Sequence, residues 1–172
     1  VSTTLRLLME MGSNFVLEED GSIFIDSSTL TNLTADYSLV KTMRASILTL
    51  GPMLAKYKKA KISLPGGCAI GTRPVNLHLD ALEKMGAKIE VKNGYIHASA
   101  KELVGTQINF DLVSVTATEN ILMAATLAKG ITTINNAAQE PEVTDLIYCL
   151  KNMGAKITGE NTSTLIIEGV DR

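Results

Sequence analysis

The stretch LDALEKMGAKIEVKNGYIHA, residues 79–98, decides the fold because it recurs twice more in the chain. Its counterparts are LRLLMEMGSNFVLEEDGSIFI at 5–25 and IYCLKNMGAKITGENTSTLII at 147–167. Each copy shows the apolar end of a helix, then Met-Gly, then a strand, a polar turn and a second strand. A glycine after an apolar helical segment is typical of a helix C-terminus. Asp20-Gly21 and Asn93-Gly94 fit two-residue hairpin turns. The sequence therefore predicts three copies of one unit.

The repeat extends upstream in the second and third copies. SILTLGPMLAKYKKAKISL at 46–64 matches NILMAATLAKGITTINN at 120–136: an apolar helix, the shared Leu-Ala-Lys, then a short strand. A second helix follows, with Pro74 or Pro141 in its first turn. TLTNLTAD (29–36) and GTQINFDL (105–112) are predicted as strands that close the first and second copies. The unit reads strand, helix, strand, helix, strand, strand, and helices are expected near 37–56, 73–85, 116–129 and 141–153.

These repeats predict an inside-out α/β repeat domain, in which pseudo-threefold units bury their helices inside surrounding sheets. The units span about 1–36, 37–110 and 111–170. The first unit lacks the leading helix and strand that the other two possess. Half a repeat leaves the apolar faces of its neighbours uncovered. We therefore expect residues 1–172 to be a single truncated domain of a longer protein.

Composition narrows the class of partner. The chain has 172 residues, 45% of them hydrophobic, and its 16 basic and 18 acidic side chains give a formal charge of −2. That balance predicts neither nucleic acid nor an anionic membrane as a partner. No apolar run approaches the roughly 18 residues that a membrane span needs. The two cysteines fit a reducing, cytoplasmic setting. No cluster has metal-ligand spacing, so we expect neither a metal nor a cofactor.

One loop distinguishes the second copy from the third. Lys56 to Gly86 spans 30 positions, whereas Lys129 to Gly154 spans 25. The five extra residues fall within LPGGCAIGTRPVN (64–76), and repeat proteins concentrate function in such insertions. Arg73 lies where a helix begins, so its guanidinium and the free N–H groups could bind one anion. Cys68 in that positive field should have a lowered pKa and be reactive. A flexible surface loop with an incidental thiol is the alternative.

The remaining candidates have ordinary structural explanations. Cys149 has helical spacing with apolar neighbours, which predicts packing. His97 is expected at the surface, and KYKKAK at 56–61 is expected to be solvated charge beside a helix end. His78, on the helix that leaves the glycine loop, fits either a structural or a functional role. Arg44, in an otherwise apolar helix, is either a snorkelling side chain or a buried partner of an anion.

Four segments carry a resemblance to a known family: YSLVKTMRASILTLGP (37–52), SLPGGCAIGTRPVNLHLDALEKMGA (63–87), VSVTATENILMAATLA (113–128) and EPEVTDLIYCLKNMGAKI (140–157). Over essentially the whole chain they resemble the UDP-N-acetylglucosamine 1-carboxyvinyltransferases, also called UDP-N-acetylglucosamine enolpyruvyl transferases. The resemblance implies two similar domains, each with three repeats and helices inside. It also implies transfer of enolpyruvate from phosphoenolpyruvate to the 3-hydroxyl of UDP-N-acetylglucosamine. That reaction is the first committed step of peptidoglycan synthesis, which cell shape and division require.

The resemblance assigns roles to individual residues. It implies that Cys68 takes part in product release and phosphoenolpyruvate handling and is the thiol that fosfomycin alkylates, and that Arg73 and Arg44 are active-site arginines. The implied substrate-binding stretches also comprise Pro74, Val75, Asn76, Leu77, His78, Ser114, Val115 and Thr116. The chain departs from the family at three positions, with Asn76 for aspartate, Leu112 for lysine and Thr116 for glycine. We expect three further parts of the family's site outside residues 1–172. They are a substrate-binding lysine, an asparagine, and the second domain with its aspartate base.

Two rival classes remain. The 5-enolpyruvylshikimate-3-phosphate synthase family resembles this one in repeats and chemistry but lacks the Pro-Gly-Gly-Cys loop. A non-catalytic nucleotide-binding repeat module, or a domain resembling RNA-phosphate cyclases, would need no reactive thiol. Only the transferase is expected to be alkylated by fosfomycin at Cys68, so this reaction distinguishes it from both rival classes.

Overall fold

The computed structural model describes residues 2–40, 43–64 and 75–171, without the side chains of Leu39 and Arg44. Its first part is a helix followed by a hairpin, with the elements α1 (Ser2–Glu10), β1 (Asn14–Leu17) and β2 (Ile23–Asp26). The second part comprises β3 (Thr34–Ala35), α2 (Tyr37–Val40), the 3-10 helix η1 (Arg44–Thr49), α3 (Leu50–Tyr57), β4 (Lys59–Ser63), α4 (Asn76–Lys84), β5 (Lys88–Lys92) and β6 (Tyr95–Ser99). The third comprises β7 (Gln107–Asn109), α5 (Val115–Ala125), β8 (Ile131–Asn135), α6 (Pro141–Asn152), β9 (Lys156–Thr158) and β10 (Thr164–Glu168).

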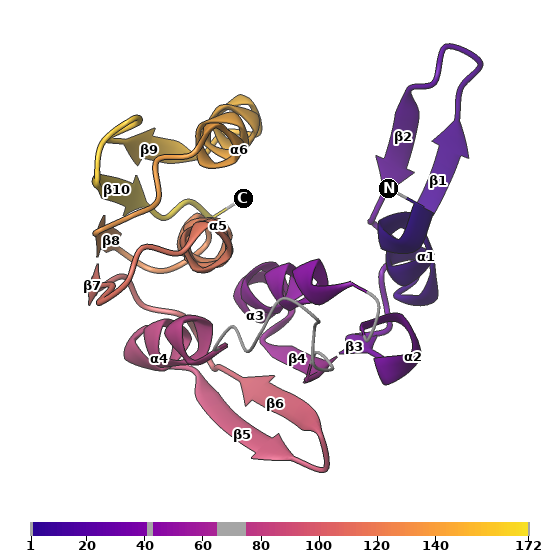
Figure 1. Cartoon of the computed structure of the whole chain (residues 1–172), viewed down its shortest axis with the longest axis horizontal. Coiled ribbons are helices and arrows are strands. Elements are labelled where there is room, and N and C mark those ends of the chain that lie inside the picture. Colours follow the sequence, from indigo (N-terminus) through magenta and orange to yellow (C-terminus); the bar gives the residue numbers. More distant parts are fainter. Residues whose placement is uncertain (1, 41–42, 65–74, 172) are drawn as a thin grey trace.

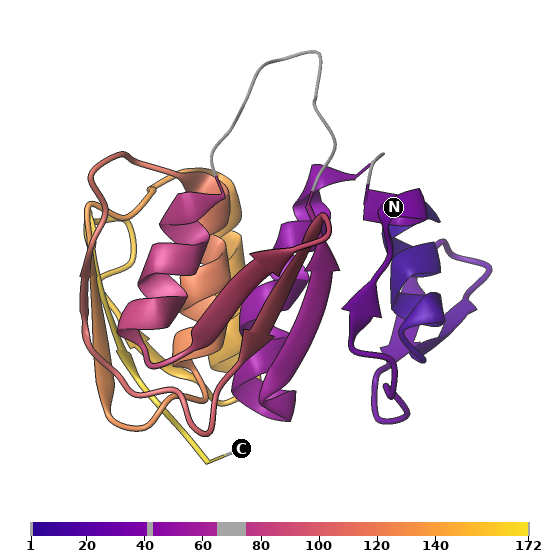
Figure 2. The same cartoon turned by 90° about the horizontal axis from the view of Figure 1, so that it is seen from below.

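The second and third parts have the same topology. Each forms a four-stranded sheet, in the orders β3-β4-β6-β5 and β7-β8-β10-β9. In both, the first pair of strands is parallel and the other pairs are antiparallel. The helices lie between the sheets (Figures 1 and 2). The predicted inside-out α/β repeat architecture is therefore confirmed, and the chain does not form one continuous parallel sheet.

The short strands β3 and β7 correct one prediction. The segments 29–36 and 105–112 were expected to close the first and second copies, but each strand pairs with the sheet of the unit that follows it. Ala35 lies opposite Ile62, and Ile108 lies opposite Ile134, both in parallel register. A parallel pair needs a crossover connection, which α3 and α5 supply. Residues 34–35 therefore belong to the sheet of the second unit, and residues 107–109 belong to the sheet of the third.

Helix α5 is the centre of the core. Seven of its residues are buried: Ala117, Thr118, Asn120, Ile121, Leu122, Ala124 and Ala125. Small alanines let neighbouring helices approach closely, and the leucine and isoleucine side chains fill the space towards the sheets. By contrast, α6 buries only Val143 and Ile147 and keeps an exposed face.

The local signals at the Met-Gly positions are confirmed. Gly12, Gly86 and Gly154 have φ values of 102°, 97° and 101°, the left-handed region that a helix C-terminus needs. Asn93 and Gly94 form the predicted two-residue turn between β5 and β6. The hairpin at Asp20-Gly21 is longer, because the Glu18 N–H donates to the Ser22 carbonyl and leaves three residues in the loop.

Two predicted helices differ from their expected bounds. The expected helix at 37–56 is divided into α2, η1 and α3. Pro52 has no N–H to bond Leu48, so the preceding turn is a 3-10 helix and the α-helix starts at Leu50. The expected helix at 116–129 ends at Ala125, because the chain then pairs at Lys129 with Val104. Among the helices formed by described residues, none is long and apolar enough to span a bilayer.

Candidate functional site

Helices α4, α5 and α6 begin beyond the carboxyl ends of strands in the parallel pairs, because they follow β4, β7 and β8 in the chain. After β3 come α2 and η1, and η1 continues into α3. Helix N-termini carry unpaired N–H groups and partial positive charge, and α/β sheets bind ligands beyond the carboxyl ends of their strands. The sequence-predicted loop at 65–74 precedes α4 in the chain. This edge of the molecule is therefore the candidate site, and it suits an anionic ligand.

A buried amide links three of these helices. The Asn120 Oδ1 atom accepts a hydrogen bond from the Gly51 N–H at 2.8 Å. Its Nδ2 atom donates to the Ile47 carbonyl at 3.1 Å and to His78 Nδ1 at 2.9 Å. Gly51 lies in the first turn of α3, which continues η1, His78 lies in the first turn of α4, and Asn120 lies in the middle of α5. One side chain therefore ties the start of α4 to α3 and α5.

His78 is neutral in this arrangement. The side chain is buried, and burial lowers the pKa of His78 to about 4. Because the Asn120 amide donates to Nδ1, that nitrogen is an acceptor and the ring proton lies on Nε2. His78, assigned by the resemblance to the substrate-binding stretch, therefore directs its Nδ1 atom at α5. Its proposed contact with substrate stays a prediction.

Charge distinguishes α4 and α5 from α6. Neither α4 nor α5 has an acidic residue in its first turn, whereas α6 has Glu142 there and Glu140 at its N-cap. In the Pro-centred comparison of the two units, Arg73 of the second occupies the place of Glu140 in the third. The positive ends of α4 and α5 therefore remain available to an anion, while acidic side chains already compensate that of α6.

The structure brings together the two predicted substrate-binding stretches that it describes. Val75 directly precedes α4 and is half-buried, as is Leu77, while Asn76 is exposed. Ser114 caps α5, accepting a hydrogen bond from the Ala117 N–H at 3.3 Å. Val115 and Thr116 form its first turn and are half-buried, and Leu112 before them is exposed. The stretches are neighbours because α4 and α5 pack together.

Three predicted residues, Cys68, Arg73 and Pro74, lie outside the described residues. The Arg44 backbone begins η1, but its side chain is also outside what the structure describes. Their catalytic and binding roles stay predictions. The described residues on either side of the glycine loop, which carries the strongest sequence signal, are Leu64 and Val75.

The prediction that Cys149 packs in the core was wrong. Its side chain is exposed. The buried residues of α6 are Val143 and Ile147, one turn apart, so a residue two positions after Ile147 lies on the opposite side of the helix. Met153, which shares the apolar spacing, is also exposed.

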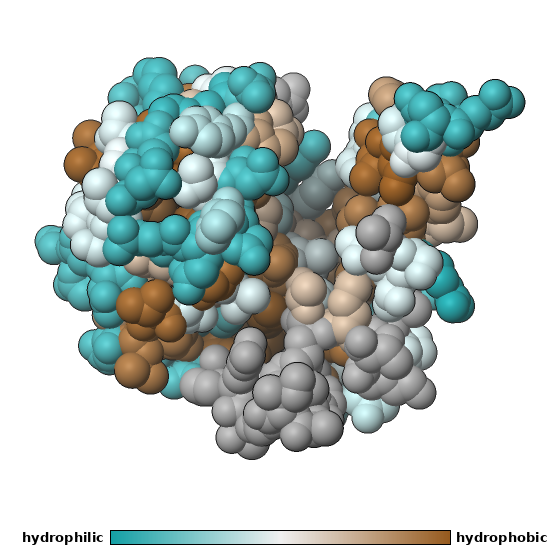
Figure 3. Space-filling view, turned by 45° about the horizontal axis from the view of Figure 1, so that its top comes forward, coloured by the Kyte–Doolittle hydropathy of each residue, from teal (hydrophilic) through white to brown (hydrophobic). Residues whose placement is uncertain are grey.

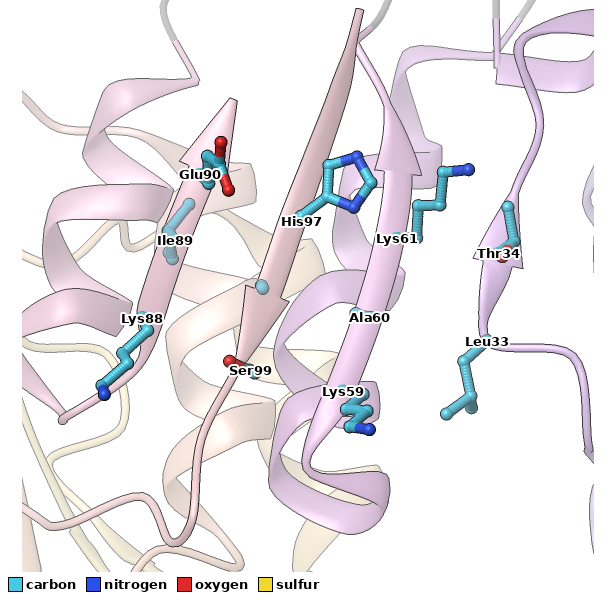
Figure 4. A pocket seen from close by; sticks show the side chains of 11 residues that line it. Leu33, Thr34, Lys59, Ala60, Lys61, Lys88, Ile89, Glu90, His97 and Ser99 are labelled. Carbon is cyan, nitrogen blue, oxygen red and sulfur yellow. The ribbon is translucent and has the colours of Figure 1, made fainter. Parts of the chain in front are cut away.

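A cavity of about 450 Å³ lies elsewhere, on the outer face of the sheet β3-β4-β6-β5, where Lys59, Lys61, Lys88 and His97 line it (Figure 4). The Lys61 ammonium lies 4.4 Å from the centroid of the Tyr95 ring. None of the predicted site residues that the structure describes lines this cavity, and its lysines lie on a solvent-facing sheet. We therefore assign the functional site to the helix starts.

A second, apolar cavity of about 360 Å³ lies between α1 and the body of the molecule. Figure 3 shows the hollow between these parts. Leu7 and Leu8 of α1 face it, together with Met43, Met123 and other apolar side chains. Glu119 also lines it, and its burial, together with the charge of Glu142, raises the pKa of the Glu119 carboxyl.

Sequence reasoning missed Asn120 and Gly51. A Cβ atom at Gly51 would collide with the main-chain oxygen of Asn120 and lie 2.5 Å from its Oδ1 atom. The sequence indicates Asn120 only as a single asparagine in the apolar run NILMAA, where a buried polar side chain needs hydrogen-bond partners. The spacing of residues does not predict which partners these are.

Comparison with known proteins identifies the family of the chain. A family model described as EPSP synthase (3-phosphoshikimate 1-carboxyvinyltransferase) matches residues 1–172. The chain is 75% identical over 171 residues to a curated UDP-N-acetylglucosamine 1-carboxyvinyltransferase of Ruthia magnifica subsp. Calyptogena magnifica, covering 99% of this chain and 41% of that relative. It is 58% identical over 172 residues to a protein of the same name from Hydrogenovibrio crunogenus, again with 41% of the relative covered. The chain thus spans about two fifths of the length of these relatives.

Two solved structures share the fold at low identity. The enolpyruvyl transferase NikO from Streptomyces tendae matches with a TM-score of 0.81 and 20% identity, over 99% of this chain and 41% of that one. An EPSP synthase from Acinetobacter baumannii matches with a TM-score of 0.72 and 21% identity, over 98% of this chain and 38% of that one. The resemblance identified from the four sequence segments is confirmed. The chain belongs to the EPSP synthase (3-phosphoshikimate 1-carboxyvinyltransferase) family.

Proposed function

We propose that the whole gene product transfers enolpyruvate from phosphoenolpyruvate to the 3-hydroxyl of UDP-N-acetylglucosamine, and that residues 1–172 supply part of the site. The observation that carries this proposal is the 75% identity, over 171 residues, to a relative named for this activity. The uncompensated starts of α4 and α5 support it, because both substrates carry phosphate. We place the reaction in the cytoplasm, at the entry to peptidoglycan synthesis and so to cell-wall growth and division.

The proposed chemistry needs cations and a proton donor. As the methylene carbon of phosphoenolpyruvate takes a proton, the sugar hydroxyl loses its own proton and its oxygen bonds to the neighbouring carbon. Loss of a proton and of inorganic phosphate then restores the double bond and leaves an enolpyruvyl ether. Arg73 and Arg44 would hold the phosphate and carboxylate while charge develops. Cys68 would take part in handling phosphoenolpyruvate and in product release, as the resemblance implies.

We further propose that residues 1–172 form one truncated domain, and that the rest of the gene product completes it and supplies a second domain. Among the described residues, the first sheet comprises β1 and β2, whereas each of the other two has four strands. Its Val16, Leu17 and Phe24 side chains are 54%, 66% and 63% exposed. Apolar surface of this kind, beside the hollow next to α1, favours a covering segment from elsewhere in the gene product.

The test is release of phosphate from phosphoenolpyruvate in the presence of UDP-N-acetylglucosamine. The whole gene product should turn over, whereas residues 1–172 alone should show no measurable activity, because the reaction needs all its groups in one closed cleft. Fosfomycin should add to Cys68 and leave the exposed Cys149 unmodified, so a Cys149→Ser variant is the matched control. No turnover by the whole gene product would refute the proposal.

A second candidate is transfer of enolpyruvate to shikimate 3-phosphate. The description of the matching family model favours it. The same phosphate assay with shikimate 3-phosphate as acceptor separates the two reactions. We expect no turnover with this acceptor, since the curated relatives at 58–75% identity are named for the UDP-sugar.

A further inference from the structure

Asn120, in the middle of α5, joins this helix to α3 and to the start of α4 through one side-chain amide. We propose that Asn120 and His78 are positioning residues, which hold the start of α4 in register with the start of α5 and thereby set the affinity for the nucleotide end of the substrate. The inference rests on the proposed function, because it concerns the same two substrate-binding stretches. Neither residue needs to touch the reacting atoms for this role.

Three hydrogen bonds and complete burial fix the position of the Asn120 amide. Its three partners lie 69, 73 and 42 residues away along the chain, and each bond is between 2.8 and 3.1 Å long. Asn120 is 0% exposed. In such a place water cannot replace a lost partner, so an unmade bond leaves a buried polar group unsatisfied. The close approach of α3 at Gly51 also prevents the amide from moving away from α4.

The hydrogen bond to His78 acts on the proposed binding segments directly. His78 follows Asn76 and Leu77 in the first turn of α4, so the imidazole fixes the rotation of that turn. Asn120 lies six residues after the cap Ser114, about 9 Å along α5 at the usual helical rise. Releasing the bond would let the start of α4 shift against the start of α5. Small displacements of this kind weaken substrate binding far more than they change the fold.

The repeat itself does not require the polar pair. Both His78 and Leu146 lie eight residues before the glycine of Met-Gly in their units. In this glycine-centred comparison, which is shifted by one residue from the Pro-centred one, the half-buried Leu146 of the third unit occupies the place of His78 and packs on the core. The third unit therefore has an apolar side chain where the second has His78. Buried polar pairs often serve to specify one arrangement rather than to add stability, and that is the role we assign here.

The main experiment uses Asn120→Leu in the whole gene product. The leucine keeps a side chain of similar size but removes the amide, so the neutral imidazole of His78 loses its hydrogen-bond partner in either tautomer. The KM for UDP-N-acetylglucosamine should rise about tenfold, roughly the effect of one lost hydrogen bond, with kcat changed less than about threefold.

Histidine titration gives a readout independent of turnover. In ¹³C-histidine-labelled protein, His78 should titrate at about 4 in the wild type, where burial is the cause of the lowered pKa. In Asn120→Asp the adjacent carboxylate should raise that pKa above its ordinary value. His78→Leu should raise the KM as Asn120→Leu does. His78→Asn, which keeps an acceptor near the Nδ1 position, should recover most of the lost affinity.

Thr118→Val is the matched control. Thr118 is on the same helix and equally buried, but its hydroxyl accepts from the Ala138 N–H and makes no contact with α4 through that bond. This variant should lose similar stability with an unchanged KM. Equal rises in KM for Asn120→Leu and Thr118→Val, or an unchanged KM in Asn120→Leu, would overturn the positioning role alone. A wild-type gene product without turnover would overturn the proposed function and the positioning role with it.

Discussion

Gly51→Ala tests the close contact between α3 and α5, because two physical effects predict opposite signs. Gly51 lies inside α3, where alanine is favoured over glycine by about 1 kcal/mol on helix propensity. An added Cβ atom, however, would collide with the main-chain oxygen of Asn120. It would also lie 2.5 Å from Asn120 Oδ1 and 3.2 Å from the Cβ atom of Ala124. The sign of the change in stability therefore reports whether the helices touch.

We expect the steric cost of the added Cβ atom to exceed the gain in helix propensity. Overfilling a tight core costs about 1–3 kcal/mol. Displacing α3 from α5 also stretches the 2.8 Å bond from the Gly51 N–H, whose loss costs about 1 kcal/mol. After the gain in propensity, Gly51→Ala should lower the free energy of unfolding by about 2 kcal/mol. The nearest atom belongs to the main chain, so adding Asn120→Ala should not restore the loss.

Urea denaturation followed by circular dichroism measures this change. The midpoint should fall in Gly51→Ala with an unchanged slope. Lys56→Ala, at an exposed position of the same helix, is the control and should change stability by less than about 0.5 kcal/mol. A midpoint above that of the wild type would refute the reasoning, since propensity alone would then govern the site.

Three further predictions concern buried polar groups. The pKa of His78 is about 4 in the folded protein and 6.5 ordinarily, so the free energy of unfolding should be unaffected by His78 above pH 6.5 and should fall by about 3 kcal/mol as the pH decreases towards 4. In urea titrations at several pH values, His78→Leu should show a smaller decline of this free energy. Burial and Glu142 raise the pKa of Glu119, so Glu119→Gln should raise the melting temperature at pH 7 but not at pH 4; an equal gain at both would exclude charge as the cause. The Thr132 hydroxyl is buried without a hydrogen-bond partner among the described residues, so Thr132→Val should stabilise by about 1 kcal/mol, and a loss on denaturation would reveal a bond.

Signals carried by neighbouring residues were readable without the structure. The glycines after each Met-Gly helix end adopt positive φ, and the Asn93-Gly94 turn joins its two strands as predicted. The repeat pattern also predicted the inside-out architecture, because an apolar helix must bury its surface against the sheets of its own and adjacent units. The five-residue insertion directed attention to the start of α4, although the loop itself lies outside the described residues.

Relations between distant residues were not readable in this way. Spacing placed Cys149 in the core, but the orientation of α6 puts it at the surface. It also placed β3 and β7 in the preceding units, whereas their partners are β4 and β8. The cause is the same in both cases. Periodicity reports that a side chain or a strand has an apolar side, and only packing decides what covers it.

The sequence by itself determined the repeats, the helix ends and turns, and the family resemblance, because each depends on residues within a few positions of one another or on a motif. The tertiary structure decided that Asn120 binds Gly51, Ile47 and His78, which are between 42 and 73 residues away. It also decided that this one amide ties the start of α4 to α3 and α5. Such contacts arise when whole units pack against each other, and no local pattern of side chains encodes which partner a buried amide will meet.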